Sequence, residues 1–276
     1  MRTLAPLGVG FAFVLALFWA LVTGSFALPD PTAARLFHLE PKEVSYSFSG
    51  PLGKYDHAQL QRGFQVYKEV CSACHSMRLV TFNDLQGIGY NKAEVKAIAK
   101  GWVVKQPSIS DKTGEVNTRD NISSDHFPSP FANETAARAS NNGALPPDFS
   151  LIAKAREGGP AYIYSLVTGY QSVPAAQAKQ FPDSVPDAKH YYDPYFANLN
   201  IAMPPPLTSD GQVSYDDGTK ATKEQMAKDV SAFLMWAAEP KLENQHAAGI
   251  PAVIYLLIFS ALCYMSYRTI WANKEH

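Results

Sequence analysis

Cys71-Ser72-Ala73-Cys74-His75 is the stretch that decides what this 276-residue chain folds around. In a c-type haem site two thiols form thioether bonds to the porphyrin, and the histidine that directly follows them binds the iron. At this content of cysteine and histidine the pattern arises by chance about once in a thousand sequences. We therefore expect Cys71 and Cys74 to hold one covalently bound haem c, with His75 as its first axial ligand.

Two other uses of a Cys-x-x-Cys pair fit the sequence less well. A structural zinc ion takes four ligands, whereas the one further cysteine, Cys263, lies in an apolar run and no His-x₃₋₅-His pair follows. A thioredoxin-like pair needs no adjacent histidine and normally lies in a βαβ unit, which the sequence pattern lacks. Three cysteines also leave no disulfide framework.

The second axial ligand must come from elsewhere in the chain. We favour Met203, because the three prolines of the segment 200–207 forbid a helix and hold the thioether on a stiff, extended backbone. The other methionines lie in apolar terminal segments, too close to His75, or on a helix that packs on the core: Met1, Met77, Met226, Met235 and Met265. Bis-histidine ligation stays open through four histidines: His57, His126, His190 and His246.

The segment Ala137 to Ser150 carries two further candidates. Arg138 is a candidate partner of a haem propionate, since a guanidinium fork matches a carboxylate. A carbonyl of Pro146-Pro147 is a candidate acceptor for the Nδ1 proton of His75, which would orient the imidazole ring.

Between two terminal apolar segments the sequence predicts a mainly α fold with long loops. Twenty prolines indicate ordered loops wrapped around a cofactor. Apolar residues at helical spacing, capping residues and breakers predict four helices: His57 to Val70, Phe149 to Arg156 with Asp148 as N-cap, Ala161 to Val167, and the stripe Met226 to Ala237 that follows a Thr222/Gln225 capping box. The segments Gln171 to Asn200 and Asp210 to Lys220 are expected to be irregular.

The two apolar segments predict an exported, membrane-anchored protein. Leu7 to Leu28 follows Arg2 and ends in Ser25-Phe26-Ala27, which is typical of a cleaved secretory signal, with a retained anchor as the alternative. Gly249 to Tyr267 is uncharged and long enough to span a bilayer. Arg268 and Lys274 follow it, and this positive charge predicts a cytoplasmic carboxyl terminus.

Several classes of protein are excluded or disfavoured. A net charge of -1 and a pI near 6.7 give no electrostatic basis for binding nucleic acid. A free-standing haem enzyme such as a peroxidase needs an open coordination position, which a bound Met203 would close. A haem-based sensor needs an output domain, for which the nine residues after the predicted span are too few.

Seven stretches in the same order resemble the cytochrome c1 family, proteobacterial type, from about Tyr55 to Arg268. They are Cys71 to His75, Arg138 to Ser150, Pro194-Tyr195-Phe196, Met203 to Pro206, Tyr215 to Thr219, Lys228-Asp229-Val230 and Trp236 to Pro240. The chain departs from the family in two respects. It lacks the additional cysteine pair of some bacterial members, and it has Pro204 where many members have alanine.

The resemblance implies a role and a set of partners. Cys71 and Cys74 would bind haem c, His75 and Met203 would be its axial ligands, and Arg138 would lie near a propionate. The chain would be the redox subunit of a quinol-cytochrome c oxidoreductase, the cytochrome bc1 complex, and not an enzyme on its own. Its partners would be cytochrome b, a Rieske iron-sulfur protein as electron donor, a cytochrome c as acceptor, and membrane lipid, but no nucleic acid.

The expected organisation follows from the same resemblance together with the apolar segments. Residues 1–27 would be a signal peptide or amino-terminal apolar helix, 28–247 a periplasmic c-type cytochrome domain, 248–268 a transmembrane helix and 269–276 a cytoplasmic tail. The protein would lie in a bacterial inner membrane with its haem domain on the periplasmic side.

Overall fold

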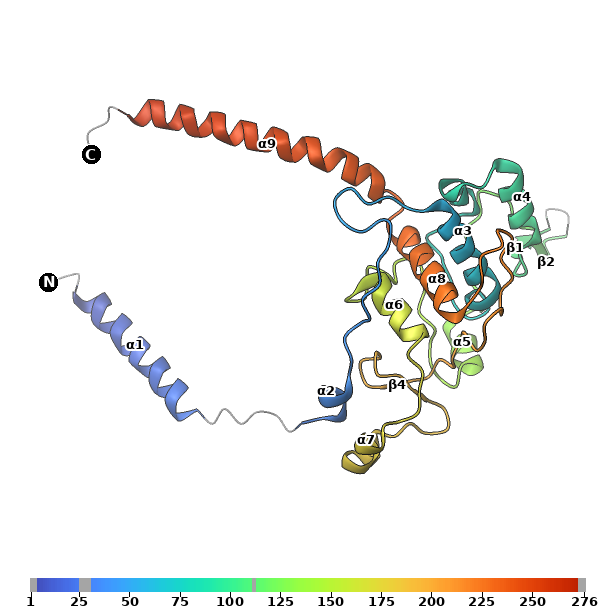
Figure 1. The fold of residues 1–276 in the computed structure, drawn as a ribbon, viewed down its shortest axis with the longest axis horizontal. Helices are drawn as coiled ribbons and strands as arrows, with labels where there is room; N and C mark the ends of the chain where they lie inside the picture. The colour runs from blue at the N-terminus through green and yellow to red at the C-terminus, as the bar shows by residue number, and fades with distance from the viewer. Residues whose placement is uncertain (1–3, 25–30, 111–112, 273–276) are drawn as a thin grey trace.

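The computed structural model describes residues 4–24, 31–110 and 113–272, with only the backbone for residues 4–7. The described chain is mainly helical, which confirms the fold class expected from the sequence. Figure 1 shows a body of short helices and long loops, from which the long carboxyl-terminal helix extends.

In the described part of the chain, helices and loops follow one another and two small sheets are present. The α-helices are α1 (Leu4–Thr23), α2 (Ala33–Phe37), α3 (His57–Val66), α4 (Lys92–Gly101), α5 (Glu134–Ser140), α6 (Gly159–Val167), α7 (Ala175–Gln180), α8 (Lys223–Ala238) and α9 (Leu242–Trp271). A π-helix, η1 (Tyr67–Cys71), and two 3₁₀-helices, η2 (Phe82–Ile88) and η3 (Pro182–Ser184), complete the helical part. Two antiparallel pairs form the sheets: β1 (Gln106–Ile109) with β2 (Val116–Arg119), and β3 (Tyr191–Tyr192) with β4 (Asn200–Ile201).

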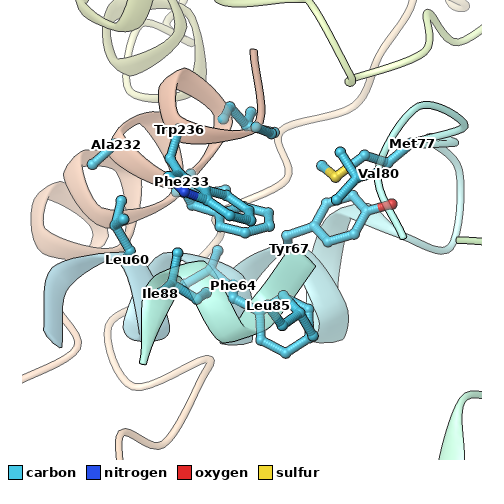
Figure 2. Packing of buried hydrophobic residues seen from close by; sticks show 14 of the residues in the cluster. Leu60, Phe64, Tyr67, Met77, Val80, Leu85, Ile88, Ala232, Phe233 and Trp236 are labelled. Carbon is cyan, nitrogen blue, oxygen red and sulfur yellow. The ribbon is translucent and has the colours of Figure 1, made fainter. Parts of the chain in front are cut away.

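The centre of the body is the packing of α3 against α8. Leu60 and Phe64 on the predicted apolar stripe of α3 are buried, as is Tyr67 in η1. Figure 2 shows these three side chains facing Phe233 and Trp236 of α8. The predicted helix His57 to Val70 is therefore confirmed as an α-helix over His57–Val66, and its last turn is the π-helix η1.

A buried carboxylate links the same two helices. Asp229 of α8 is fully buried, and its Oδ2 lies 2.9 Å from Nε of Arg62 on α3. Gln59 and Gln225 donate to Asp229 Oδ1 at 3.1 and 2.8 Å. Arg62 Nη1 also pairs with Asp217 at 2.7 Å. Because a buried charge is costly unless it is paired, these contacts fix the relative position of α3, α8 and the loop before α8.

Helix α8 begins after Thr222 and ends before Glu239 as predicted. Only half of the predicted capping box forms, because the Gln225 side chain donates to Asp229 and the Thr222 N–H to the Lys220 carbonyl. The Thr222 hydroxyl accepts from the backbone N–H of Gln225 at 3.1 Å, and the helix ends at Ala238, before Glu239. The predicted stripe is buried, including Met226, which confirms a packing role for this methionine. Helix α6 confirms the helix expected over Ala161 to Val167.

The helix expected over Phe149 to Arg156 is wrong. These residues form consecutive turns, and Asp148 does not cap a helix. Its Oδ1 accepts from the Ser150 backbone N–H at 2.9 Å, and its Oδ2 accepts from the Ser76 hydroxyl and the Arg78 backbone N–H at 2.7 and 3.0 Å. The bond from the Ser150 N–H closes a local turn that is an alternative to a helix. The Phe149 N–H and the Ser150 hydroxyl are bonded to residues 76 and 79, and these contacts hold the segment in that turn.

The loops contain more regular structure than the sequence predicts. α7, η3 and β3 lie within Gln171 to Asn200, which corrects the expectation that this segment is irregular. α5 and α7 have seven and six residues, too few to show a helical period. α4 does carry a signal, the Asn91/Glu94 capping box, which sequence reasoning missed. The segment Asp210 to Lys220 is irregular as expected.

The apolar segments form the helices α1 and α9. Among the described residues, α9 is the one helix long and apolar enough to cross a membrane, and it contains the predicted span Gly249 to Tyr267. The described side chains of α1 are exposed. The expected cleavage pattern Ser25-Phe26-Ala27 and the basic Lys274 lie outside the described residues.

Candidate haem site

The Cys71 to His75 motif forms a closed turn at the end of η1. The carbonyl of Cys71 accepts from the backbone N–H of Cys74 at 3.1 Å and from that of His75 at 2.9 Å. The Tyr67 hydroxyl donates to the carbonyl of His75 at 3.2 Å. π-helical turns are rare and occur frequently at functional sites. Here η1 connects the packed helix α3 to Cys71, the first residue of the motif.

The two thiols differ in exposure. Cys71 is half-buried and Cys74 is exposed, and neither forms a disulfide bond. Burial, with a smaller contribution from Cys74, raises the pKa of the Cys71 thiol to about 12. Cys71 is therefore a neutral thiol at physiological pH. Two free thiols on one turn are the chemistry that thioether attachment of a porphyrin requires.

His75 is oriented by a residue far away in the sequence. Its ring is buried, and Nδ1 lies 2.9 Å from the carbonyl oxygen of Pro147. Burial lowers the pKa of His75, and this outweighs the raising effects of the Pro147 hydrogen bond and of Asp148. The imidazole is thus neutral with Nδ1–H donating, which leaves the lone pair on Nε2 for a metal. The Phe149 ring stacks on the His75 ring, with 3.9 Å between the two ring centroids.

Residues 76–79 are bonded along their length to residues 148–150. The backbone N–H of Phe149 donates to the Ser76 carbonyl at 2.7 Å, and the backbone N–H of Leu79 donates to the Ser150 hydroxyl at 3.0 Å. Asp148 lies between them; burial raises its pKa, but hydrogen bonds from Ser150, Arg78 and Ser76 outweigh this and lower it. The segment that carries Pro147 is therefore fixed against the segment that carries His75.

Met203 lies on the loop between β4 and the buried Leu207. Met203 is half-buried, and its carbonyl accepts from the Tyr170 hydroxyl at 3.1 Å. Met77 and Met226 are fully buried in the core, while Met265 is exposed on α9. Among the described methionines, Met203 is the one on an irregular, proline-rich segment.

The four histidines that were alternatives to Met203 as second iron ligand lie on different parts of the chain. His57 begins α3, and His126 lies beside Thr81 in an isolated bridge; both are exposed. His190 contacts Asp187 at 2.6 Å, and His246 Nδ1 lies 3.0 Å from the Gly53 carbonyl. Of the histidines in the described residues, only His75 is buried.

Arg138 lies near the carboxyl end of α5 and is exposed. Its Nη1 donates to the carbonyl of Gly143 at 3.2 Å, and its own carbonyl accepts from Asn141 and Gly143. The positive φ angles of Asn142 and Gly143 turn the chain back toward the guanidinium. Arg138 therefore helps to close this loop, and among the residues that the structure describes it forms no ion pair with a carboxylate.

The donor chemistry of these residues fits a c-type haem. A hydrogen-bonded turn presents two unpaired thiols, and the buried histidine after them has one ring nitrogen engaged by Pro147. Sequence reasoning found these residues but missed Tyr67, Ser76 and Tyr170. They lie outside any short motif, and their contacts appear only when distant segments come together.

Comparison with known proteins places this geometry in a family. Residues 46–274 match the model of the "Cytochrome C1 family". A protein named cytochrome c1 from Rhodospirillum rubrum is 44% identical over 84% of this chain and 87% of its own length. An Arabidopsis thaliana protein named cytochrome c1 1, heme protein, mitochondrial, is 44% identical over 92% of this chain and 80% of its own. A Bradyrhizobium diazoefficiens protein named cytochrome b/c1 is 42% identical over 86% of this chain, which spans 36% of that relative. The resemblance seen in the sequence is confirmed, and the chain belongs to the cytochrome C1 family.

Proposed function

We propose that this chain is the haem-bearing electron-transfer subunit of a cytochrome bc1 complex. It receives electrons from a Rieske iron-sulfur protein and passes them to a cytochrome c. It is a redox subunit of the quinol-cytochrome c oxidoreductase and has no separate catalytic activity. The observation that carries the proposal is the Nδ1 contact of the buried His75 with Pro147, directly after the two free thiols, in a chain of this family.

Cys71 and Cys74 would hold haem c through thioether bonds, and His75 would be a ligand of its iron. The haem supplies a one-electron ferric/ferrous couple. Pro147 keeps the Nδ1 proton of His75 in place, which fixes the tautomer and makes Nε2 the ligating nitrogen. The hydrogen bonds of Ser76, Asp148 and Phe149 prevent this carbonyl from moving away.

Met203 would provide the second ligand of the iron, and Arg138 would pair with a haem propionate. A thioether is a soft ligand that favours ferrous iron, so Met/His ligation gives the raised potential that an acceptor of electrons from a Rieske centre needs. Arg138 would exchange a neutral acceptor, the Gly143 carbonyl, for a charged one, which gives a stronger hydrogen bond.

The chain is anchored in a bacterial inner membrane with its haem domain in the periplasm. We propose residues 1–27 as signal peptide or apolar helix, 28–247 as the periplasmic domain, 248–268 as the transmembrane helix and 269–276 as the cytoplasmic tail. The length and apolar character of α9 support the span. The positive charge of Arg268 and Lys274 supports the orientation.

Cytochrome b, the Rieske protein and a cytochrome c are the proposed partners, together with lipid around α9. The relative named cytochrome b/c1 supports an association with cytochrome b. Exposed apolar side chains along α9 suit contact with lipid or with another transmembrane helix.

Spectroscopy combined with rapid kinetics tests this function. We expect the reduced subunit to have a six-coordinate, low-spin haem c that does not bind carbon monoxide. In purified membranes quinol should reduce it rapidly, and removal of the Rieske protein should abolish this reduction. A five-coordinate haem that binds carbon monoxide, or rapid reduction without the Rieske protein, would contradict the proposal.

A further inference from the structure

The middle of the loop that carries Met203 is held to the rest of the protein by one hydrogen bond. Among the described residues, the Tyr170 hydroxyl is the one hydrogen-bond partner of residues 202–205, through the Met203 carbonyl at 3.1 Å. Pro204 and Pro205 have no backbone N–H to donate. The position of the Met203 backbone therefore depends on a side chain 33 residues earlier in the chain.

Both ends of this loop are fixed independently of Tyr170. Before the loop, β4 pairs with β3, Tyr191 with Ile201. After it, Leu207 is buried in the main core and Gln212 Nε2 donates to the Pro206 carbonyl at 2.9 Å. Among the described residues, the four residues between these two points form no hydrogen bond other than the one from the Tyr170 hydroxyl to the Met203 carbonyl.

The residue just before β4 has a strained backbone conformation. Leu199 has a φ of +69°, in the left-handed region that is unfavourable for a branched side chain. Its side chain is fully buried beside Ala33 and Tyr192 in a second small core, and its carbonyl accepts from Asp193 at 2.9 Å. Such strain persists only where the surroundings fix the chain, and it occurs often next to functional residues.

Tyr170 is itself held firmly. A Cβ placed on Gly169 would lie 2.5 Å from Cδ2 of Tyr195, so the chain here lies directly against the loop that follows β3. The next residue, Gln171, donates to the Tyr192 carbonyl at 3.4 Å, and the Tyr170 ring meets the Tyr191 ring edge to face at 6.5 Å. These contacts hold the backbone and ring of Tyr170 in place, so its hydroxyl has a defined position beside the Met203 carbonyl.

We propose that Tyr170 is a positioning residue for the sixth iron ligand, holding the Met203 carbonyl so that the thioether stays at bonding distance. The proposal rests on the proposed ligation by Met203. Loss of the hydroxyl frees the middle of the loop while both of its ends remain fixed. The methionine-bound state then loses the net contribution of one hydrogen bond, and an external ligand displaces the thioether more easily.

The test uses the full-length, haem-loaded chain in its complex. Three variants are compared with the parent protein: Tyr170→Phe, Tyr191→Phe and Met203→Leu. Tyr191→Phe is the matched control, because Tyr191 is the ring next to Tyr170 and its hydroxyl forms no hydrogen bond within the described part of the chain. The readouts are the weak far-red charge-transfer band of thioether-bound ferric haem and the affinity of the ferric haem for added imidazole.

We expect Tyr170→Phe to keep covalent haem and a weakened charge-transfer band, with an affinity for imidazole about five-fold above that of the parent, the equivalent of one hydrogen bond. Tyr191→Phe should match the parent protein. If Tyr170→Phe also matches the parent while Met203→Leu loses the band, the inference is overturned and the ligation by Met203 stands. If the parent protein itself lacks the band, the ligation by Met203 fails and the inference fails with it.

Discussion

Gly63 on α3 lies against the backbone of Asp229 on α8, so closely that an added Cβ would lie 2.0 Å from the Asp229 carbonyl oxygen. Only a residue without a side chain permits this approach. α3 continues through η1 into Cys71, so this crossing also determines where the haem motif lies relative to the core.

Replacing Gly63 by alanine should therefore destabilise the protein. The new methyl group meets backbone atoms, which cannot move aside as a side chain can, and overpacking of this kind costs about 3 kcal/mol. Chemical denaturation of the detergent-solubilised full chain measures the change. Gly101→Ala is the matched control, since a Cβ on Gly101 meets nothing within 4 Å. Equal stability of the two variants would contradict the close helix crossing.

Removing both thiols should abolish covalent haem. In a Cys71→Ser, Cys74→Ser double variant no thioether can form, whereas either single variant retains at most one. Haem staining after denaturing electrophoresis checks this result. Cys263→Ser on α9 is the control and should stain as the parent does. Unchanged staining of the double variant would exclude Cys71 and Cys74 as attachment sites.

Met203→Leu should open the iron while leaving haem attached. Leucine preserves the bulk of the side chain but removes the sulfur, so the midpoint potential should fall by a large amount and carbon monoxide should bind. Met203→Lys restores a ligand, but a hard amine gives a low potential, and electron flow from quinol should stall in both variants. Redox titration and carbon monoxide difference spectra are the measurements.

Met235→Leu provides the control for this experiment, because Met235 packs against the core on α8. It should change neither the potential nor the response to carbon monoxide. If Met203→Leu also keeps both, Met203 is not the ligand, and one of the histidines His57, His126, His190 or His246 must take its place.

Truncation before Gly249 should release a haem-bearing periplasmic domain. The retained start of α9 is tied to the body, because Glu243 accepts from the Tyr55 N–H at 2.8 Å and His246 contacts the Gly53 carbonyl. Cell fractionation with haem staining reads the result. A truncated chain that stays firmly in the membrane after removal of residues 1–27 would show that α9 is not the main anchor.

Asp193 should make the stability fall as pH rises. Burial raises the pKa of this carboxyl to about 6, above its unfolded value, so the folded state binds its proton more tightly. The associated stability is present at low pH and is lost as pH rises through the folded pKa, between about pH 4 and about pH 7. In Asp193→Asn the fall over this range should be smaller than in the parent. Urea denaturation at a series of pH values tests it, and parallel curves would exclude the effect.

The sequence alone determined the chemistry of the site and the helices with long signals. The Cys71 to His75 motif is local, so it is readable without any fold, and α8 and α9 have apolar patterns long enough to identify. The interaction of His75 with a proline carbonyl in Pro146-Pro147 was also predicted, because a metal-bound histidine usually donates its other ring N–H to a carbonyl or a carboxylate, and the structure shows this contact. Met203 as ligand and Arg138 as propionate partner stay predictions.

Tertiary structure decided how those residues are held. The contact of Gly63 with Asp229, the hydrogen bonds of Ser76 and Arg78 to Asp148, and the bond from Tyr170 to Met203 each join residues that are far apart in the chain. No local period or motif encodes such pairs, because their stability comes from groups that meet only after the chain has folded. For the same reason Asp148 looked like the cap of a helix: it does accept the Ser150 N–H, but the residues after it are bonded to residues 76 and 79 and no helix forms.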